Sequence, residues 1–143
     1  MPTVALVLPS SSYRGPDFVA AADELGVDLV IATDGSLPVA SGRILRVVPV
    51  DFADAVTAVE HIVLAGATTP LDAVVGVDDG GVVVAALAAQ ALGLPHNAPS
   101  AVAATRDKAE MRRLLEAAGV PGARHVVVAS VDEALVAAAK KHH

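Results

Sequence analysis

Cysteine and tryptophan are absent from the 143 residues, and the aromatic residues are two Phe and one Tyr. Without cysteine the chain forms neither a disulfide nor a thiolate metal site, and nothing in the sequence suggests secretion. Because aromatic rings are so few, the stacking platforms on which single-stranded nucleic acids bind are missing as well.

Basic residues are also scarce, with 10 Lys and Arg against 16 Asp and Glu, which gives a net charge of −6. They are scattered along the chain and form no basic stripe. Neutralising nucleic-acid phosphates requires clustered Lys and Arg, so we expect no nucleic-acid partner.

No apolar run is long enough to span a membrane. Residues 3–8 lack a preceding basic segment, and residues 82–92 end at Gly93-Leu94-Pro95. Both stretches are far shorter than a bilayer requires. We therefore expect no membrane partner and a cytoplasmic location.

Small and β-branched residues dominate a composition that is 54% hydrophobic. Such side chains suit a parallel sheet packed closely against helices. Four apolar runs are expected as strands, at residues 3–8, 27–32, 43–50 and 71–77, of which the third is more polar and so nearer an edge. Helices are expected between and after them, at residues 16–25, from 51 or 52 to about 65, and after the loop of residues 78–81 to about residue 92. This alternation predicts an α/β fold with a three-layer, Rossmann-like parallel sheet that carries helices on both faces.

The segment after Pro95 follows another pattern. A single helix over residues 99–118 would place the Asp107 charge in its buried stripe, which is unfavourable. We therefore expect two helices, the second opened by a capping box in which Asp107 is the N-cap and Glu110 bonds back to the Asp107 amide. A strand is expected at residues 123–130, then a helix from Ser130 to about residue 140. His142-His143 resembles a tag remnant.

The first candidate site follows the first expected strand. Three hydroxyls, free amides and one guanidinium before a helix could hold an anion, and they belong to Ser10, Ser11, Ser12, Tyr13 and Arg14. A polar turn without a ligand explains the same residues equally well. The segment is neither a dinucleotide fingerprint nor a Walker loop.

The second candidate site follows the fourth expected strand, at Asp78, Asp79, Gly80 and Gly81. The carboxylates could hold a substrate ammonium or Mg²⁺, and the glycines allow close approach of the backbone. Alternatively, Asp79 only caps the helix, which is the more frequent role of such a residue, while Asp78 is solvated.

Lys108 is the third candidate, at the start of a helix where the dipole disfavours a cation. An anionic partner such as a phosphate would make this placement favourable. Alternatively, Lys108 is solvated and loosely paired with a neighbouring carboxylate, which would contribute little stability and indicate no site. His61, His96 and His125 lack metal-ligand spacing, and we assign no metal ligand and no catalytic residue.

Several motifs together resemble the ATP-grasp ligase superfamily, most closely between residues 71 and 121. They are Val74-Val75-Gly76-Val77-Asp78-Asp79 before an Ala-rich helix, Leu92-Gly93-Leu94-Pro95, Asp107-Lys108 and Ala118-Gly119-Val120-Pro121. The chain is similar to the pre-ATP-grasp domain at the N-terminus of biotin carboxylase. Among members, the carbamoyl-phosphate-synthase-like and amino-acid-ligase-like proteins resemble it most.

The resemblance implies a division into a pre-ATP-grasp domain over residues 1–98, linker helices over 99–121, and the beginning of an ATP-grasp lobe or a C-terminal extension over 122–143. It implies that Lys108 contacts ATP and that the two candidate loops shape the site of a small-molecule acceptor. In the intact enzyme ATP and Mg²⁺ would activate a carboxylate as an acyl phosphate, which an amine or similar nucleophile then attacks.

The ATP clamp and the Mg²⁺-binding carboxylates of the family lie beyond the last residue of this chain. We therefore expect an N-terminal portion that is inactive alone, binds no cofactor tightly and has the remaining ATP-grasp lobes as its partner. Such domains often lie at interfaces, so a homodimer is a further partner to test. The alternative is a stand-alone flavodoxin-like or dimerisation module without catalysis. A receiver-like role is disfavoured, because Pro9-Ser10 occupies the place of the acidic pair.

Overall fold

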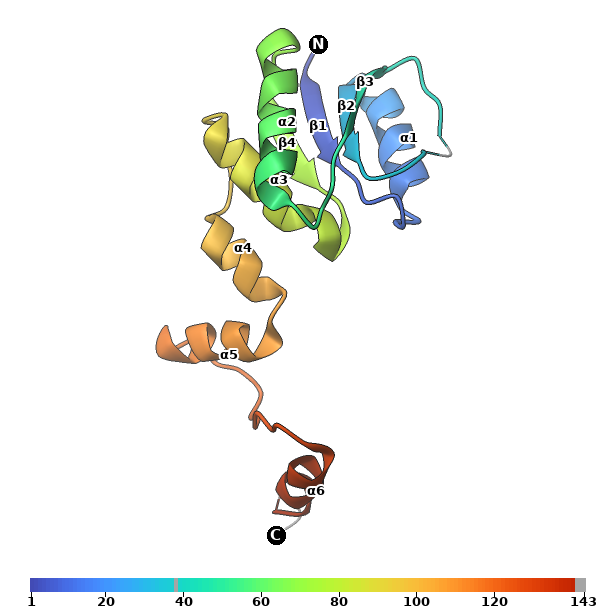
Figure 1. The fold of residues 1–143 in the computed structure, drawn as a ribbon. Coiled ribbons are helices and arrows are strands. Elements are labelled where there is room, and N and C mark those ends of the chain that lie inside the picture. Colours follow the sequence, from blue (N-terminus) through green and yellow to red (C-terminus); the bar gives the residue numbers. More distant parts are fainter. Residues whose placement is uncertain (38, 141–143) are drawn as a thin grey trace. The chain divides into compact units, whose positions relative to one another are not determined.

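The computed structural model describes residues 1–37 and 39–140 (Figure 1). The chain divides into two compact units, Met1–Ala103 and Ala104–His143, and each is described here by itself. The expected tag remnant, His142-His143, lies outside the described residues.

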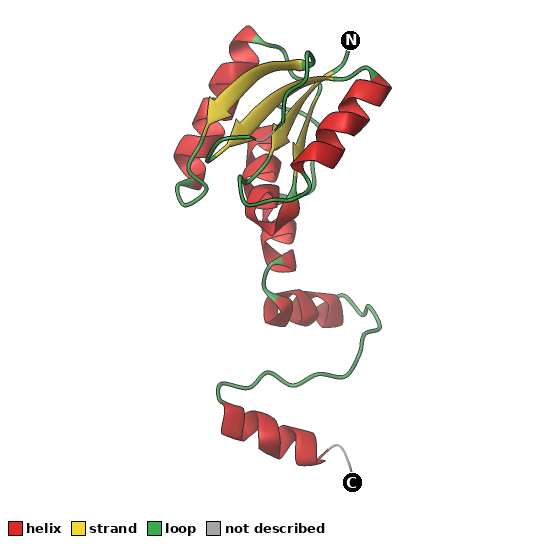
Figure 2. Cartoon of the chain, turned by 90° about the vertical axis from the view of Figure 1, so that its right-hand side faces the viewer, coloured by secondary structure: helices red, strands yellow, loops and turns green. Residues whose placement is uncertain are grey.

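The first unit is built on a four-stranded sheet, drawn as yellow arrows in Figure 2. Its strands are β1 (Thr3–Val7), β2 (Asp28–Thr33), β3 (Ile44–Pro49) and β4 (Ala73–Gly76). All neighbours pair in parallel, in the order β3-β2-β1-β4. The predicted parallel sheet is confirmed, and β3 lies at an edge as its more polar sequence predicted.

Helices cover both faces of this sheet, which confirms the three-layer fold (Figure 1). On one face, α1 (Gly15–Leu25) packs Val19 and Ala22 against Leu6 and Ile31. On the other face, α2 (Ala55–Thr68) and α3 (Asp78–Ala91) pack against strand residues of opposite parity. Successive residues of a strand point to opposite faces, so a continuous apolar run supplies both layers of the core.

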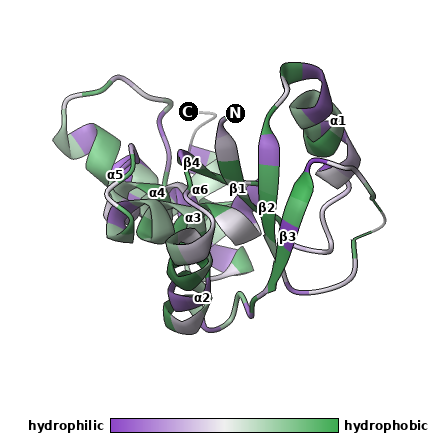
Figure 3. Cartoon of the chain, turned by 90° about the horizontal axis from the view of Figure 1, so that it is seen from above, coloured by the Kyte–Doolittle hydropathy of each residue, from purple (hydrophilic) through white to green (hydrophobic). Residues whose placement is uncertain are grey.

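Apolar residues are concentrated in the sheet and not in one long helix. Figure 3 shows the ribbons of the strands mostly green, the colour of hydrophobic residues. Ala5, Val7 and Ile31 have no exposed surface at all. Among the described helices, none combines the length and the apolar character needed to cross a bilayer.

Local signals account for most helix boundaries in the first unit. Pro16 lies in the first turn of α1, and Gly26 ends the helix with a φ of 69°, a left-handed conformation that glycine adopts readily. The expected start of α2 at residue 51 or 52 is wrong. Asp51 instead accepts a hydrogen bond from the Ala53 amide in a turn, and Asp54 caps the helix by accepting from the Thr57 amide.

Beyond the sheet, α4 (Pro99–Thr105) crosses the division between the units, and the second unit holds α5 (Lys108–Ala117) and α6 (Val131–Lys140). The prediction of two helices instead of one is therefore confirmed. Asp107 caps α5 as expected, accepting from the amides of Ala109 and Glu110.

The second half of the predicted capping box is wrong. The Asp107 amide donates to the Ala104 carbonyl, and the Glu110 carboxylate pairs with Arg113 at 2.7 Å and 2.8 Å. A bidentate guanidinium one turn away offers this carboxylate a stronger partner than a single amide does.

The strand expected at residues 123–130 is also wrong, since this segment is irregular and belongs to no sheet. Val126 and Val127 are 62% and 69% exposed. A strand needs a neighbour for its amides and carbonyls, and no strand is present in the described part of the second unit. The apolar pattern indicated β propensity correctly, but propensity without a partner does not form a sheet.

Candidate substrate site at the carboxyl edge of the sheet

The connections that follow β1 and β4 leave the sheet in opposite directions. β1 leads into α1 on one face, whereas β4 leads into α3 on the other face. Because β1 and β4 are neighbours, their two connections diverge at the carboxyl ends of the strands. In open α/β sheets this reversal point is where ligands bind.

Ser10 to Arg14 form the β1–α1 connection, as the sequence predicted. The Ser12 amide donates to the Pro9 carbonyl at 2.9 Å, and the Ser12 hydroxyl accepts from the Arg14 amide at 3.2 Å. Ser10, Ser11 and Tyr13 are exposed. The loop is thus turned by its own hydrogen bonds and presents side chains outward.

Asp78 to Gly81 form the first turn of α3 and not a loop. The helix begins after Val77 without a side-chain cap, so the role of Asp79 as the N-cap is not observed. Asp78 has a φ of 56°, and it is the only non-glycine residue with positive φ among the described residues. Aspartate tolerates this left-handed conformation better than most residues, but at a cost.

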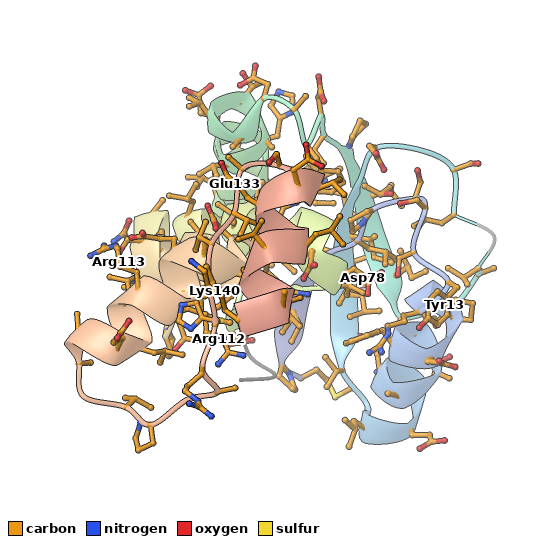
Figure 4. All side chains as sticks on the ribbon, turned by 90° about the horizontal axis from the view of Figure 1, so that it is seen from below. Tyr13, Asp78, Arg112, Arg113, Glu133 and Lys140 are labelled. Carbon is orange, nitrogen blue, oxygen red and sulfur yellow. The ribbon has the colours of Figure 1, made fainter. Side chains whose placement is uncertain are left out.

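The structure brings the two predicted segments together. Arg14 Nε lies 3.8 Å from Asp78 Oδ1. The Arg14 guanidinium also lies 5.8 Å from the centre of the Tyr13 ring. The Tyr13 phenol, followed by the Asp78 carboxylate, raises the pKa of Arg14. Figure 4 labels Tyr13, in the β1–α1 connection, and Asp78, in the first turn of α3.

Asp34, which follows β2, joins this site; the sequence indicated its loop, residues 33–41, as one at the carboxyl ends of the strands but did not name Asp34 as a site residue. Its Oδ1 accepts a 2.7 Å hydrogen bond from the Ser10 amide, and this bond lowers the pKa of Asp34. The signal was present in Thr33-Asp34-Gly35, since β2 and β1 are parallel neighbours whose carboxyl ends meet. The neighbouring Thr33 hydroxyl is buried and has no hydrogen-bond partner among the described residues.

Lys108 is the first residue of α5, in the second unit. It is exposed, and no ion pair joins it to another described residue. The Asp107 carboxylate accepts hydrogen bonds from the amides of Ala109 and Glu110. The exposed ammonium of Lys108, at the start of the same helix, could therefore meet an anionic ligand.

Basic side chains also gather elsewhere in the second unit. Arg112, Arg124, His125 and Lys140 line an open hollow of about 930 Å³, together with Glu116. Arg112 and Lys140 can be followed in Figure 4. The sequence had shown these residues only as scattered charges.

A metal site is not evident on the described part of the chain. No group of three His, Asp or Glu side chains there could hold an ion. Asp78 and Asp79 alone do not supply the several oxygen ligands that Mg²⁺ requires.

Three solved structures share the fold at low sequence identity. An L-amino acid ligase from Bacillus licheniformis superimposes with a TM-score of 0.73 at 19% identity, over 99% of this chain and 42% of that chain. A phosphoribosylglycinamide synthetase from Anaerococcus prevotii gives 0.61 at 20% identity, over 96% and 35%. Glycinamide-RNase-transformylase T from Mycobacterium tuberculosis gives 0.62 at 25% identity, over 94% and 38%. The chain therefore spans less than half of each of these proteins.

A search of the curated proteins found no match. The family model of the ATP-grasp N-terminal domain, however, matches residues 19–96, which is more than half of the chain. This range runs from α1 through α3 and includes the β4–α3 turn with Asp78. The chain therefore belongs to the ATP-grasp family and carries its N-terminal domain.

Proposed function

We propose that this chain is the substrate-side portion of an ATP-dependent ligase. In the intact enzyme ATP phosphorylates a carboxylate, and an amine or similar nucleophile then attacks the acyl phosphate and releases inorganic phosphate. The observation that carries this proposal is the approach of Arg14, in the β1–α1 connection, to Asp78, in the first turn of α3, at the carboxyl ends of two paired strands.

The acceptor binds beside these two segments in the proposal. Arg14 and the hydroxyls of Ser10, Ser11 and Ser12 supply hydrogen-bond donors on one side, beside the Tyr13 ring. The first turn of α3 supplies carboxylates and closely approaching backbone on the other side, through Asp78, Asp79, Gly80 and Gly81. Positioning of this kind is a large part of the catalysis of a group transfer.

Lys108 contacts the phosphates of ATP in the proposal. Its exposed position at a helix start, beside the Asp107 cap, supports this role. The other phosphate ligands and the Mg²⁺ ligands are assigned to the remaining ATP-grasp lobes. We accordingly propose domains over residues 1–98, 99–121 and 122–143, with the last range being the beginning of the next lobe or a C-terminal extension.

Exposed apolar side chains in the second unit favour a protein partner. Val126, Val127, Leu135 and Val136 are all more than half exposed. Exposing apolar surface to water is unfavourable. If this segment begins an ATP-grasp lobe, the rest of that lobe would cover these side chains. The same surface also supports the alternative of a dimerisation module.

Similarity in fold to an L-amino acid ligase supports an amino-acid-ligase-like enzyme. The resemblance of the sequence also extends to carbamoyl-phosphate-synthase-like members, so we keep such an enzyme beside it. Both would make the chain part of a ligase that acts on a carboxylate.

The experiment is a titration of ATP into the ¹⁵N-labelled chain, followed by NMR. We expect shifts at Lys108 and the first turn of α5, which Lys108→Met abolishes and the control Lys140→Met leaves in place. We expect no ATP hydrolysis, because one lysine cannot assemble the closed site. Detectable hydrolysis, or shifts that survive Lys108→Met, would contradict the proposal.

A further inference from the structure

Apolar side chains of the second unit gather around one open hollow of about 630 Å³. Val126, Val127 and Val128 line it from the irregular segment before α6, and Val136 and Ala137 line it from α6. Val126, Val127 and Val136 are each more than half exposed. Apolar surface gathered on one face in this way marks a site of association with another protein surface.

The hollow carries opposite charges at its two ends. Asp132 lies in the first turn of α6, Lys140 is the last residue of that helix, and both line the hollow on either side of Val136. Residues spaced in this way lie on the same side of a helix, so the three side chains form one row. No ion pair joins Asp132 or Lys140 to another described residue. Both charges can therefore meet charges of another molecule.

Neighbouring residues reinforce this separation of charge. Glu133 adds a second carboxylate to the first turn of α6, and Figure 4 labels Glu133 and Lys140 near the two ends of that helix. Arg112 and Arg124 line an adjoining hollow, which shares Lys140 with the first one. Among the described residues that line this second hollow, Glu116 is the only acidic one. The face thus has an acidic end and a basic end with valines between them.

We propose that two copies of this chain pair through this face, with their α6 helices antiparallel about a two-fold axis at Val136. Asp132 and Lys140 lie about one turn before and after Val136, so the two-fold rotation places Asp132 of each copy beside Lys140 of the other. The same ion pair then forms twice, and Val136 packs against its counterpart. A two-fold interface requires a patch that complements itself, and a row of acid, valine and base does so. The inference goes beyond the proposed function, which leaves the geometry of a dimer open.

Charge complementarity selects both the occupant of this face and its direction. A parallel pair of α6 helices would bring Asp132 against Asp132 and Lys140 against Lys140, and like charges at an interface are unfavourable. The antiparallel arrangement turns both contacts into attractions. A second copy supplies this complement by symmetry, and burial of the valines adds a favourable apolar contribution. In the proposed ligase the rest of the lobe would cover the same face, so the dimer is the state of the chain without that lobe.

The test is sedimentation equilibrium of the full chain from about 10 μM to about 1 mM, a range that detects weak association. One short helix and a few valines make a small interface, so we expect a reversible and weak equilibrium between monomer and dimer. Val136→Glu places two like charges at the two-fold axis and should weaken the dimer about tenfold or more. The matched control is Val56→Glu, in the first turn of α2, where the valine is 71% exposed. This control should dimerise as the unaltered chain does.

Charge reversal tests the antiparallel register. Asp132→Lys and Lys140→Asp each convert both ion pairs into repulsions, so each variant alone should dimerise about tenfold more weakly or worse. An equimolar mixture of the two should dimerise again, because every lysine of the first variant then faces an aspartate of the second. Recovery in the mixture also shows that both variants are folded. The control is Asp17→Lys, which reverses an exposed carboxylate in the first turn of α1 and should leave the dimer unchanged.

The inference is overturned if the chain stays monomeric over the whole concentration range, a result that would leave this face to the rest of a lobe. It is equally overturned by aggregates without a dimeric end point, by charge-reversed variants that dimerise alone as well as the unaltered chain does, or by a mixture that stays monomeric. None of these outcomes depends on nucleotide, so the contact between Lys108 and ATP is tested separately by its own titration.

Discussion

The carbonyl oxygen of Val7 lies so close to Gly81 that a Cβ built on Gly81 would stand 2.6 Å from it. Val7 ends β1 and Gly81 lies in the first turn of α3, so this contact sets how closely the helix approaches the edge of the sheet. Alanine has a higher helix propensity than glycine. At position 81, however, its Cβ would clash with a backbone carbonyl, which cannot rotate away as a side chain could.

Gly81→Ala should therefore lower the free energy of unfolding by about 2 kcal/mol or more, as overpacking against a rigid neighbour does. Urea unfolding followed by circular dichroism measures it. Gly42→Ala is the matched control, because nothing lies within 4 Å of a Cβ there. Equal stability of the two variants would show that α3 can move away from β1.

The left-handed backbone of Asp78 leads to a second prediction. Asp78→Gly and Asp78→Ala both remove the carboxylate, but only glycine adopts a φ of 56° without strain. The glycine variant should be the more stable of the two by about 1 kcal/mol in urea unfolding. An alanine variant as stable as the glycine variant would mean that the turn relaxes to a negative φ.

The hydrogen bond from the Ser10 amide to Asp34 leads to a third prediction, on pH. This bond lowers the pKa of Asp34 in the folded chain, so its stabilisation is present above the pKa of the unfolded state, about 3.9, and is lost as pH falls through the lower folded value. Asp34→Ala should destabilise the chain at pH 7, and this difference should shrink near pH 3. The control is Glu24→Ala, an exposed carboxylate of α1. A difference that is the same at both pH values would contradict the role of the charge.

The cap of α5 leads to a fourth prediction. Asp107→Ala removes the acceptor of the Ala109 and Glu110 amides and should cost about 1 kcal/mol of helix stability. Glu110→Ala removes only an exposed pair with Arg113 and should have a smaller effect. Amide hydrogen exchange in residues 108–112 distinguishes the two. Greater loss of protection in Glu110→Ala would contradict the assignment of the cap.

The parallel sheet, its edge strand β3 and the split between α4 and α5 were predictable because each rests on a local signal. Continuous apolar runs indicate buried strands, Pro16 and Gly26 delimit a helix, and Asp107 caps one. The errors arose where a competing partner was invisible in the sequence. The Glu110 carboxylate pairs with Arg113 and not with the Asp107 amide. Residues 123–130 have β propensity but no neighbouring strand to pair with.

The candidate site was predictable in part. The segments of Ser10 to Arg14 and of Asp78 to Gly81 were identified because polar residues after buried strands mark the carboxyl edge of a sheet. Asp34 was not identified as a site residue, because an aspartate before glycine looks like an ordinary turn. Its hydrogen bond to Ser10 exists only after β1 and β2 pair.

The amino-acid sequence alone determined the class of fold, the family and the segments that carry polar groups, since hydrophobic period, turn residues and motif spacing are local properties of a chain. Only the tertiary structure decided that Arg14 faces Asp78, that Gly81 touches the end of β1 and that Asp34 holds the Ser10 amide. Those contacts depend on strand order and register, which arise when distant segments bury their apolar faces together.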